Sequence, residues 1–340
     1  MANTDCAAGL DCGIAYAFVR SGGVWTLQQT LVSSDHGALD RLGNRVALSG
    51  DGKTALIGAN GAPCGGVDTC GAAYVFTRSG NVWTERQRLS GDPTPGLFFG
   101  RNLALSADGN TALIVEGLDL GILIGKVFVF TQSGGVWSLQ GTISGPDSST
   151  DFANDPMALS GDGNLVMIRE DNTPGLGGGS VFVFVRHGAT WSPEAVLHGE
   201  PADEAHDFGR FPVISDDGQI AVIPTRLTGC SPFDPLCKNG IADVFLRNGG
   251  AWNRAQRISL PGTGDDYALG PVALSGDGKT LLLGAPRVPC AAGSQCGTVY
   301  AFTNAPLAVG IPALSGPGLA ILTLALIAAA LIFLRWRRSI

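Results

Sequence analysis

Two markers recur together along most of this chain, and they constrain its fold more than any other feature. One is an Asp-Gly dipeptide at steps of 57, 54, 55 and 60 residues, with its aspartates at Asp51, Asp108, Asp162, Asp217 and Asp277. The other is a tryptophan at steps of 58, 54, 54 and 61 residues, found at Trp25, Trp83, Trp137, Trp191 and Trp252. Because both markers keep the same uneven step, insertions fall between fixed elements. Self-similarity at such a period is typical of repeat architectures.

Each repeat unit divides into four short apolar or β-branched runs, bounded by Gly, Asp or Ser. In the unit from Leu42 to Leu89 the runs cover residues 46–49, 54–57, 73–78 and 82–89. Runs of this length and composition predict strands and are too short for typical helices. The Asp-Gly dipeptide between the first two runs favours a type I′ hairpin turn, which needs positive φ at both central residues. The unit is therefore predicted to be a four-stranded antiparallel meander.

The third and fourth runs differ in their predicted burial. The third run is apolar on both faces, as in 127–130 and 181–184, which is typical of a strand covered on both sides. The fourth run is polar after its tryptophan, as in 84–88, and charges on an outer strand discourage edge-to-edge aggregation. Together these patterns predict an all-β fold, a β-propeller of four-stranded antiparallel blades with about five repeat units.

All eight cysteines fall in closely spaced pairs, each between the second and third runs of a unit. The pairs are Cys6/Cys12, Cys64/Cys70, Cys230/Cys237 and Cys290/Cys296. Even counts at short repeated spacing favour local disulfides. The alternatives are zinc ligation, although the spacing lacks a second pair or a histidine nearby, and free thiols. Disulfides would place the repeat domain outside the cytosol. The loops at 116–126 and 169–180 contain no cysteine, so we expect the bridges to be additions to the blade.

The chain begins in the middle of a repeat. The segment 6–13 resembles 290–297, so the first strands after Met1 correspond to the third and fourth of a unit. The C-terminal repeat supplies first, second and third strands. A combined closing blade would make Tyr16–Phe18 and Tyr300–Phe302 compete for one place. We therefore expect that Met1 lies inside a longer reading frame whose upstream part carries a signal peptide and further repeat.

The C-terminal residues differ from the repeats in composition and predict a membrane environment. We divide the chain into a repeat domain (1–304), a linker (305–316), an uncharged apolar segment (317–334) and a basic tail (335–340). As a helix the apolar segment would be about 27 Å long, enough to cross a bilayer core, and the alternative is a buried globular helix. The basic residues that follow, Arg335, Arg337 and Arg338, predict a cytoplasmic C-terminus and a propeller outside the cytoplasm.

The repeats resemble bacterial FG-GAP-type repeats, which are related to the integrin-α propeller. The resemblance is carried by VALSGDGKT at 46–54, by Phe99-Gly100 and Phe208-Gly209, by Gly284-Ala285-Pro286 and by the AYVF-type third runs. It covers 1–304 and implies a propeller used in adhesion or surface recognition. The integrin-type calcium loop is not matched, because the segment 49–52 has one carboxylate, so we expect no calcium from the resemblance and no other cofactor.

The C-terminal region resembles the IPTL-CTERM sorting signal, in which a short motif precedes an apolar helix and a basic end. The motif residues here are Ile311, Pro312, Ala313, Leu314 and Ser315, with Ala313 where the family has threonine and without a following tryptophan. The resemblance implies recognition by an exosortase-like membrane protease in the envelope of a Gram-negative bacterium.

Acidic residues recur in the loops before the first strands, and they are the main candidates for a binding surface. They are Asp35, Asp40, Asp92, Asp147, Asp151, Asp203, Asp207, Asp265 and Asp266. They could form a ring facing a cation or a basic partner, or serve as turn-forming residues. One histidine-carboxylate run, 198–207, offers either a metal site or a solvated loop.

The leading hypothesis is a membrane-anchored, extracytoplasmic propeller that acts as a recognition or adhesion module, or as an envelope-matrix component, and that is not an enzyme. Its ligand would be a protein or glycan. The net charge of −7 argues against nucleic acid as a partner. The alternative is a secreted propeller hydrolase or lyase, because propellers also host enzymes. No nucleophile elbow, zinc-protease motif or phosphate loop occurs in the sequence.

Overall fold

The computed structural model divides the chain into two compact units, Met1–Pro306 and Leu307–Ile340. The residues it describes all lie in the first unit: 9–66, 69–117, 125–145, 152–153, 156–170, 179–199, 207–226, 240–260, 271–285 and 297–303. Within these ranges no helix is long and apolar enough to cross a membrane. The predicted linker, membrane segment and basic tail lie outside the described residues.

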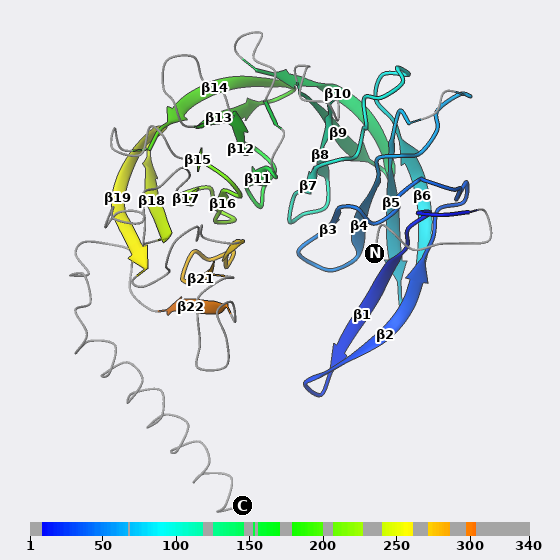
Figure 1. Cartoon of the computed structure of the whole chain (residues 1–340), viewed down its shortest axis with the longest axis horizontal. Coiled ribbons are helices and arrows are strands. Elements are labelled where there is room, and N and C mark those ends of the chain that lie inside the picture. Colours follow the sequence, from blue (N-terminus) through cyan, green and yellow to red (C-terminus); the bar gives the residue numbers. More distant parts are fainter. Residues whose placement is uncertain are drawn as a thin grey trace, which may run out of the picture. The chain divides into compact units, whose positions relative to one another are not determined.

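The described residues form antiparallel sheets that follow one another along the chain, as the colours of Figure 1 show. An N-terminal hairpin consists of β1 (Ala15–Ser21) and β2 (Val24–Leu31). Blade 1 is β3 (Val46–Leu48), β4 (Thr54–Ala59), β5 (Ala72–Ser79) and β6 (Val82–Leu89). Blade 2 is β7 (Leu103–Leu105), β8 (Thr111–Glu116), β9 (Lys126–Ser133) and β10 (Val136–Ser144).

The later blades repeat this order. Blade 3 is β11 (Ala158–Leu159), β12 (Leu165–Glu170), β13 (Ser180–His187) and β14 (Thr190–Leu197). Blade 4 is β15 (Asp207–Phe208), β16 (Val213–Ile214), β17 (Ile220–Arg226), β18 (Gly240–Asn248) and β19 (Ala251–Leu260). Blade 5 is β20 (Val272–Leu274), β21 (Thr280–Ala285) and β22 (Thr298–Thr303). The described residues thus form an all-β, five-blade propeller of four-stranded blades, as the repeat predicted, with three strands described in blade 5 and with β15 and β16 sharing the place of one strand beside β17.

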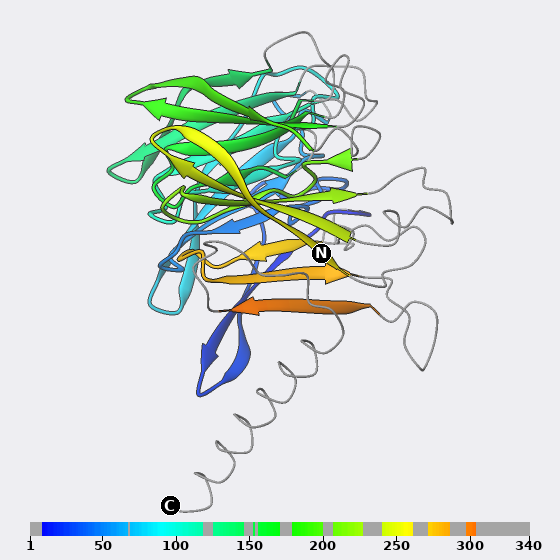
Figure 2. The same ribbon diagram turned by 90° about the vertical axis from the view of Figure 1, so that its left-hand side faces the viewer.

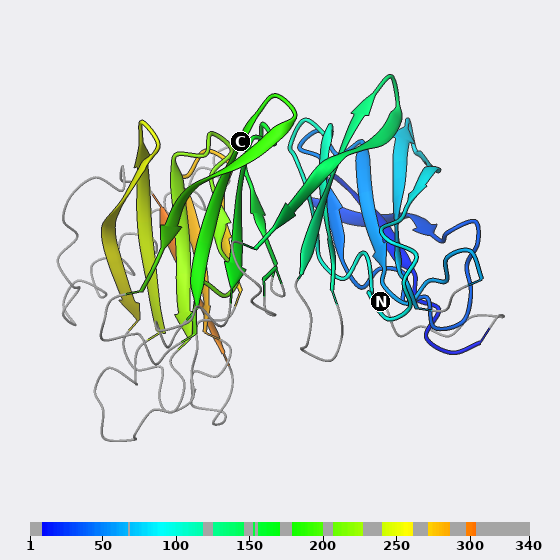
Figure 3. The same ribbon diagram turned by 90° about the horizontal axis from the view of Figure 1, so that it is seen from above.

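The two ends of the strands are built differently, and Figures 2 and 3 show them at opposite sides. At the turn end lie the Asp-Gly turns and the hairpins between third and fourth strands. At the loop end lie the connections between second and third strands and those between blades. Isolated parallel bridges join these two kinds of connection, for example between Gly71 and Phe99.

The Asp-Gly turns have one geometry in all five blades, although it is not the predicted type I′ hairpin. In blade 1 the turn is closed by a hydrogen bond from the Gly52 amide to the Ser49 carbonyl at 2.9 Å, and Gly52 takes φ 67°. The Ser49 hydroxyl donates to Asp51 Oδ1 at 2.7 Å and accepts from the Thr54 amide at 3.0 Å. The turn therefore runs from Ser49 to Gly52, and Gly52 takes a positive φ whereas Asp51 does not, although a type I′ turn centred on these two residues needs it at both.

Backbone hydrogen bonds link the five turns in series. The amide of Gly50 donates to the carbonyl of Ala107 in the next blade. The amides of Ala107, Gly161 and Asp216 donate in turn to the carbonyls of Gly161, Asp216 and Gly276, and all four distances are 2.8 to 2.9 Å. Side chains link the outer strands in a similar way. The Gln29 amide group contacts both the backbone N–H and C=O of Trp83, and Gln87 does the same with Trp137. Each blade therefore fixes the register of the next.

The hydrophobic core lies between the blades. Each cluster contains side chains from the facing surfaces of two neighbouring sheets, and Phe99 of blade 2 packs edge-on against Phe128 and Phe130 within one of them. Alternation places successive residues of a strand on opposite faces, so a third strand such as β5 contributes to two clusters. This double burial explains why the third runs are apolar throughout.

At the C-terminal end of the repeats, β22 takes the third-strand place beside β21. The homologous strand β1 pairs with β2 instead. The competition that the sequence predicted between Tyr16–Phe18 and Tyr300–Phe302 is therefore resolved in favour of the latter, because β21 and β22 are neighbours in sequence and close a short connection.

Candidate recognition surface

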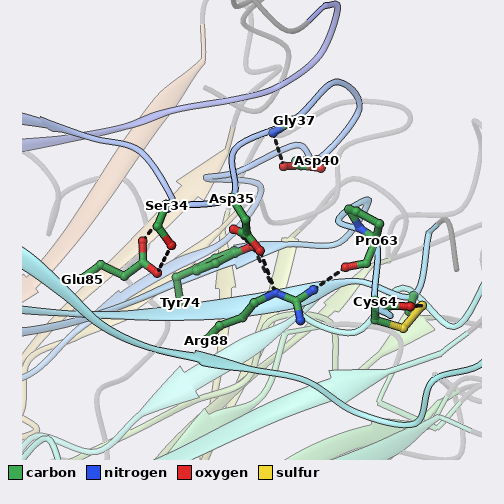
Figure 4. A network of polar contacts seen from close by, with 10 residues as sticks. Ser34, Asp35, Gly37, Asp40, Pro63, Cys64, Tyr74, Glu85 and Arg88 are labelled. Atoms are coloured by element: carbon green, nitrogen blue, oxygen red, sulfur yellow. Dashed lines mark hydrogen bonds and ion pairs between the residues drawn. A yellow bond between two sulfur atoms is a disulfide. The ribbon is translucent and has the colours of Figure 1, made fainter. Parts of the chain in front are cut away.

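The first part of the loop end is an ion-pair network at blade 1, drawn in Figure 4. The hydroxyl of Tyr74, in β5, donates to Asp35 Oδ1 at 2.6 Å. Arg88, in β6, pairs with Asp35 Oδ2 at 3.2 Å and donates to the Tyr74 hydroxyl at 3.3 Å. Burial, followed by the hydrogen bond to Asp35, raises the pKa of Tyr74. The predicted loop aspartate Asp35 is therefore held by two side chains that rise from the blade.

The same network reaches the disulfide loop. Arg88 also donates to the carbonyl of Pro63, which precedes the disulfide-bonded Cys64 (Figure 4). The predicted Cys64–Cys70 disulfide is present, and Cys12 is disulfide-bonded as well. The other five predicted cysteines, Cys6, Cys230, Cys237, Cys290 and Cys296, lie outside the described residues. In blade 1, one arginine thus connects two loops that are separate in sequence.

Asp40 is the one described loop aspartate that is buried, with 1% of its surface exposed. Its Oδ2 accepts a hydrogen bond from the Gly37 amide at 2.6 Å, whereas Oδ1 has no partner. Burial raises the pKa of Asp40, and the Gly37 hydrogen bond opposes this effect. Asp40 therefore stabilises its own loop, and its buried side chain is not exposed to a binding partner.

In blade 2 the loop end carries a buried carboxylate that the sequence analysis missed. Glu116, at the end of β8, is 3% exposed, and its Oε1 accepts from the Asp92 amide at 2.8 Å. Burial raises the pKa of Glu116 to about 7, and the Asp92 hydrogen bond opposes the shift. The predicted loop residue Asp92 itself pairs with Lys126 at 2.8 Å. The signal in the sequence was the position of Glu116 as the last residue of an otherwise apolar second strand.

In blade 3 the histidine of the histidine-carboxylate run makes one contact through its ring among the described residues, and its backbone carbonyl accepts a hydrogen bond from Arg254 at 2.8 Å. His198 Nδ1 lies 3.0 Å from the Ser180 hydroxyl, and burial lowers the pKa of the imidazole. Residues 200–206 lie outside the described residues, and so do Asp147, Asp151, Asp265 and Asp266. The side chain of Asp207 also lies outside the described part of the structure. Among the described residues, no group of three or more His, Cys, Asp or Glu side chains is placed to hold a metal ion.

Blade 4 replaces the aromatic residue of the third strand by a carboxylate. Asp243 occupies the place that Tyr74 has in blade 1, is fully buried and receives two hydrogen bonds of 2.8 Å from Arg257. Arg257 lies opposite Asp243 in the sheet, as Arg88 lies opposite Tyr74. The two blades thus use the same cross-strand position for different polar pairs. In the sequence this change is visible as a break in the AYVF pattern at 242–245, where Asp243 replaces the aromatic residue.

Together, the described carboxylates of the loop end do not form a shared ring. Asp40 binds the Gly37 amide within its own loop, whereas Asp35 and Asp92 bind side chains of the strands beside them. Each of the three thus stabilises its own loop. The loops at the loop end differ from blade to blade, whereas the sheets that carry them are alike. Such loops are where binding residues concentrate in proteins with rigid scaffolds.

The comparisons with known proteins agree with this architecture. Residues 25–76 match the sequence model of the FG-GAP repeat. The fold is thus that of a β-propeller, and the segment 25–76 of this propeller is similar to the FG-GAP repeat. The chain has no significant match among curated proteins.

Solved structures that are similar to this chain include two bacterial proteins. The periplasmic gluconolactonase PpgL of Pseudomonas aeruginosa is 16% identical, with a TM-score of 0.51 over 86% of this chain and 79% of that chain. A putative 6-phosphogluconolactonase of Bacteroides fragilis is 15% identical, with a TM-score of 0.49 over 75% of this chain and 67% of that chain. At these identities the likeness concerns the fold alone.

Proposed function

We propose that this chain is an extracytoplasmic recognition or adhesion module, held at the envelope of a Gram-negative bacterium, with a protein or glycan as its ligand and without enzymatic activity. The observation that carries the proposal is a contrast between the two ends of the blades. The sheets and their turn ends are alike in every blade, whereas the loops at the loop end are built differently. In blade 1 a disulfide closes one loop and Arg88 connects this loop to the loop of Asp35, whereas in blade 2 the loop of Asp92 is held by Glu116. The FG-GAP match at 25–76 supports the recognition class.

The proposed extracytoplasmic, membrane-anchored location rests on two independent features. The Cys64–Cys70 disulfide favours an oxidising compartment. The apolar segment 317–334 and the basic residues after it favour a single membrane span with the C-terminus in the cytoplasm. The motif 311–315 would be read by an exosortase-like protease.

The location is tested by fractionating Gram-negative cells that express the full chain or a variant lacking 305–340, each fused behind a signal peptide because we expect one upstream of Met1. We expect the full chain in the membrane fraction and the shortened chain in the soluble extracytoplasmic fraction. Mass spectrometry of the mature C-terminus checks the sorting step. An envelope form that retains Arg338 would reject cleavage, and a shortened chain that stays in the membrane would reject the anchor.

The recognition surface is tested with a matched pair of charge reversals. Lys126 lies at the loop end, where it pairs with Asp92, whereas Lys53 lies at the turn end. We expect Lys126→Glu to reduce binding of the full chain to a glycan array or to envelope proteins at least tenfold, with Lys53→Glu close to wild type. Equal effects of the two variants would contradict a loop-end surface. Turnover of gluconolactone by the full chain would contradict the non-enzymatic assignment.

A further inference from the structure

The fourth strands lie at the outer rim of the blades, and a glutamine links them across the first two junctions between sheets, here called seams (Figure 1). The side-chain amide of Gln29 binds both backbone groups of Trp83. Its Nε2 donates to the carbonyl at 2.9 Å, and its Oε1 accepts from the N–H at 2.8 Å. Gln87 binds Trp137 in the same way, at 2.8 and 2.9 Å. A primary amide fits this place because it offers a donor and an acceptor on one side.

The seam between blades 2 and 3 lacks this link. Gly141 of β10 has the register position that Gln87 has in β6, next to the β-bulge. A Cβ added at Gly141 would meet no atom within 4 Å, so the place that Gln87 fills at the earlier seam is open here. Ala195 has this position at the seam between blades 3 and 4, but there Glu194 accepts from the indole N–H of Trp252 at 2.9 Å and links the two sheets.

The backbone of Trp191, in β14, points outward at the open seam. Trp191 lies opposite Arg186 of β13, and the Arg186 amide donates to the carbonyl of Asn164 on the other side of its strand. Pairs in an antiparallel ladder alternate between those that exchange hydrogen bonds and those that do not, so the N–H and C=O of Trp191 point away from β13. In blade 1 the same two groups of Trp83 are the ones that the glutamine of the preceding sheet binds.

Two buried side-chain atoms at this seam have no hydrogen-bond partner among the described residues. They are Nε1 of Trp191 and Oε1 of Gln140, which is the bulged residue before Gly141. At the seam between the hairpin and blade 1 the corresponding atoms bind each other, with Gln28 Oε1 accepting from Trp83 Nε1 at 3.1 Å. Buried polar atoms in native proteins nearly always have a partner, so an unpaired donor and acceptor beside an open place indicate that a ligand binds there.

We propose that this notch, formed by Gln140, Gly141 and Trp191, binds the primary carboxamide of a glutamine or asparagine side chain of a partner protein. The notch offers two donors, the backbone and indole N–H groups of Trp191, and two acceptors, the Trp191 carbonyl and Gln140 Oε1. A primary amide has two N–H donors and an oxygen with two lone pairs, which matches this set.

Other polar groups match the notch less well. A carboxylate has no donor for the Trp191 carbonyl, and a guanidinium has no acceptor for the Trp191 N–H. The N–H and C=O of a secondary amide lie on opposite sides of a planar trans bond, so they cannot reach both backbone groups together. A protein is the expected source because the amides that fill the equivalent place at other seams, those of Gln29 and Gln87, are carried by a polypeptide strand.

The notch is a second binding site, separate from the recognition surface proposed above. Trp191 follows the hairpin between β13 and β14, so it lies near the turn end of the blade and not at the loop end. Binding at the notch therefore does not depend on the ligand of the loop end.

The test follows the tryptophan backbone and indole signals of the isotope-labelled full chain by NMR in a mild detergent, with Trp191→Phe identifying those of Trp191. The probes are propionamide, which copies the end of a glutamine side chain, and its analogues propionate and N-methylpropionamide. Gly141→Gln supplies the missing side chain from within the protein. Gly141→Ala is the matched control that leaves the notch open, and unchanged signals of Trp83 and Trp137 show that each variant is folded.

We expect propionamide to shift the Trp191 signals saturably in the wild type and in Gly141→Ala, and this shift to be lost in Gly141→Gln. Neither analogue should cause it. The proposal would be overturned by the absence of a shift with propionamide, by an equal response to N-methylpropionamide, or by a shift that persists in Gly141→Gln. A blocked Ser-Gln-Ser peptide should bind more tightly than free L-glutamine, and the reverse order would overturn a protein as the source.

Discussion

The turn end and the loop end of the propeller obey different rules, although both belong to the same strands. At the turn end every blade uses a serine hydroxyl bound to an aspartate, as in Ser49–Asp51 and Ser160–Asp162, with backbone bonds to the next blade. At the loop end the corresponding places hold a Tyr-Arg-Asp network in blade 1 and an Asp-Arg pair in blade 4. The uniform end keeps the blades in register. The other end is thereby free to vary.

The largest effect is expected at the loop end of blade 4. Asp243→Ala would leave Arg257, which is 29% exposed, without its two hydrogen bonds, and we expect a loss of about 4 kcal/mol in the free energy of unfolding. Urea denaturation followed by tryptophan fluorescence measures it. The variant Asp243→Ala/Arg257→Ala should lose less than the sum of the single changes. Additive losses would mean that the pair is not a unit.

Glu116 should make the stability depend on pH. Its pKa rises from 4.5 to about 7 on folding, so the folded state binds the proton more tightly. The stabilisation is complete below pH 4.5 and falls as the pH rises to 7, by about 3 kcal/mol. Glu116→Gln should remove this slope, whereas Glu85→Gln should leave it in place. Parallel pH profiles for the wild type and Glu116→Gln would show that Glu116 ionises normally.

The disulfide should contribute less. Replacing Cys64 and Cys70 by alanine opens a short loop, for which the chain-entropy model gives roughly 2 kcal/mol. The Arg88 bond to Pro63 should hold part of the loop afterwards. Denaturation with and without a reductant measures the difference. A wild type that is insensitive to a reductant at equilibrium would contradict a stabilising role.

The smallest effects are expected at the turn end, and they should be equal. Ser106→Ala and Ser160→Ala each remove a buried hydroxyl that accepts from a backbone amide at 2.9 and 3.0 Å. Each should cost about 1 kcal/mol, the usual value of one buried hydrogen bond. Denaturation of the two variants in parallel measures the difference between them. A difference of more than 1 kcal/mol would break the uniformity of this end.

Much of the fold was predictable because its signals are local. The strands at 46–48, 54–59, 72–79 and 82–89 agree closely with the four predicted runs, since short apolar runs and turn residues act over a few positions. The local disulfide Cys64–Cys70 was predictable for the same reason. The turn type was wrong, because the pairing of Ser49 with Asp51 outweighed the preference of the Asp-Gly dipeptide.

The candidate site was predictable only in part. The acidic loops were correctly placed at one end of the blades, and Asp35 and Asp92 are there. Their partners were not foreseen, because Tyr74 is 39 positions from Asp35, and Arg88 comes from yet another strand. Glu116 was missed because a charged residue at the end of a buried strand acquires its properties from burial, which a periodic pattern does not report.

The sequence by itself determined the repeat, the strands within it, the propeller class and the position of the turns, because each of these depends on neighbours within a few residues. Only the tertiary structure decided which side chains meet between blades, as with Glu194 and Arg247, which are 53 positions apart. It also decided that β22, and not β1, pairs with β21. Contacts of this kind depend on how whole sheets pack.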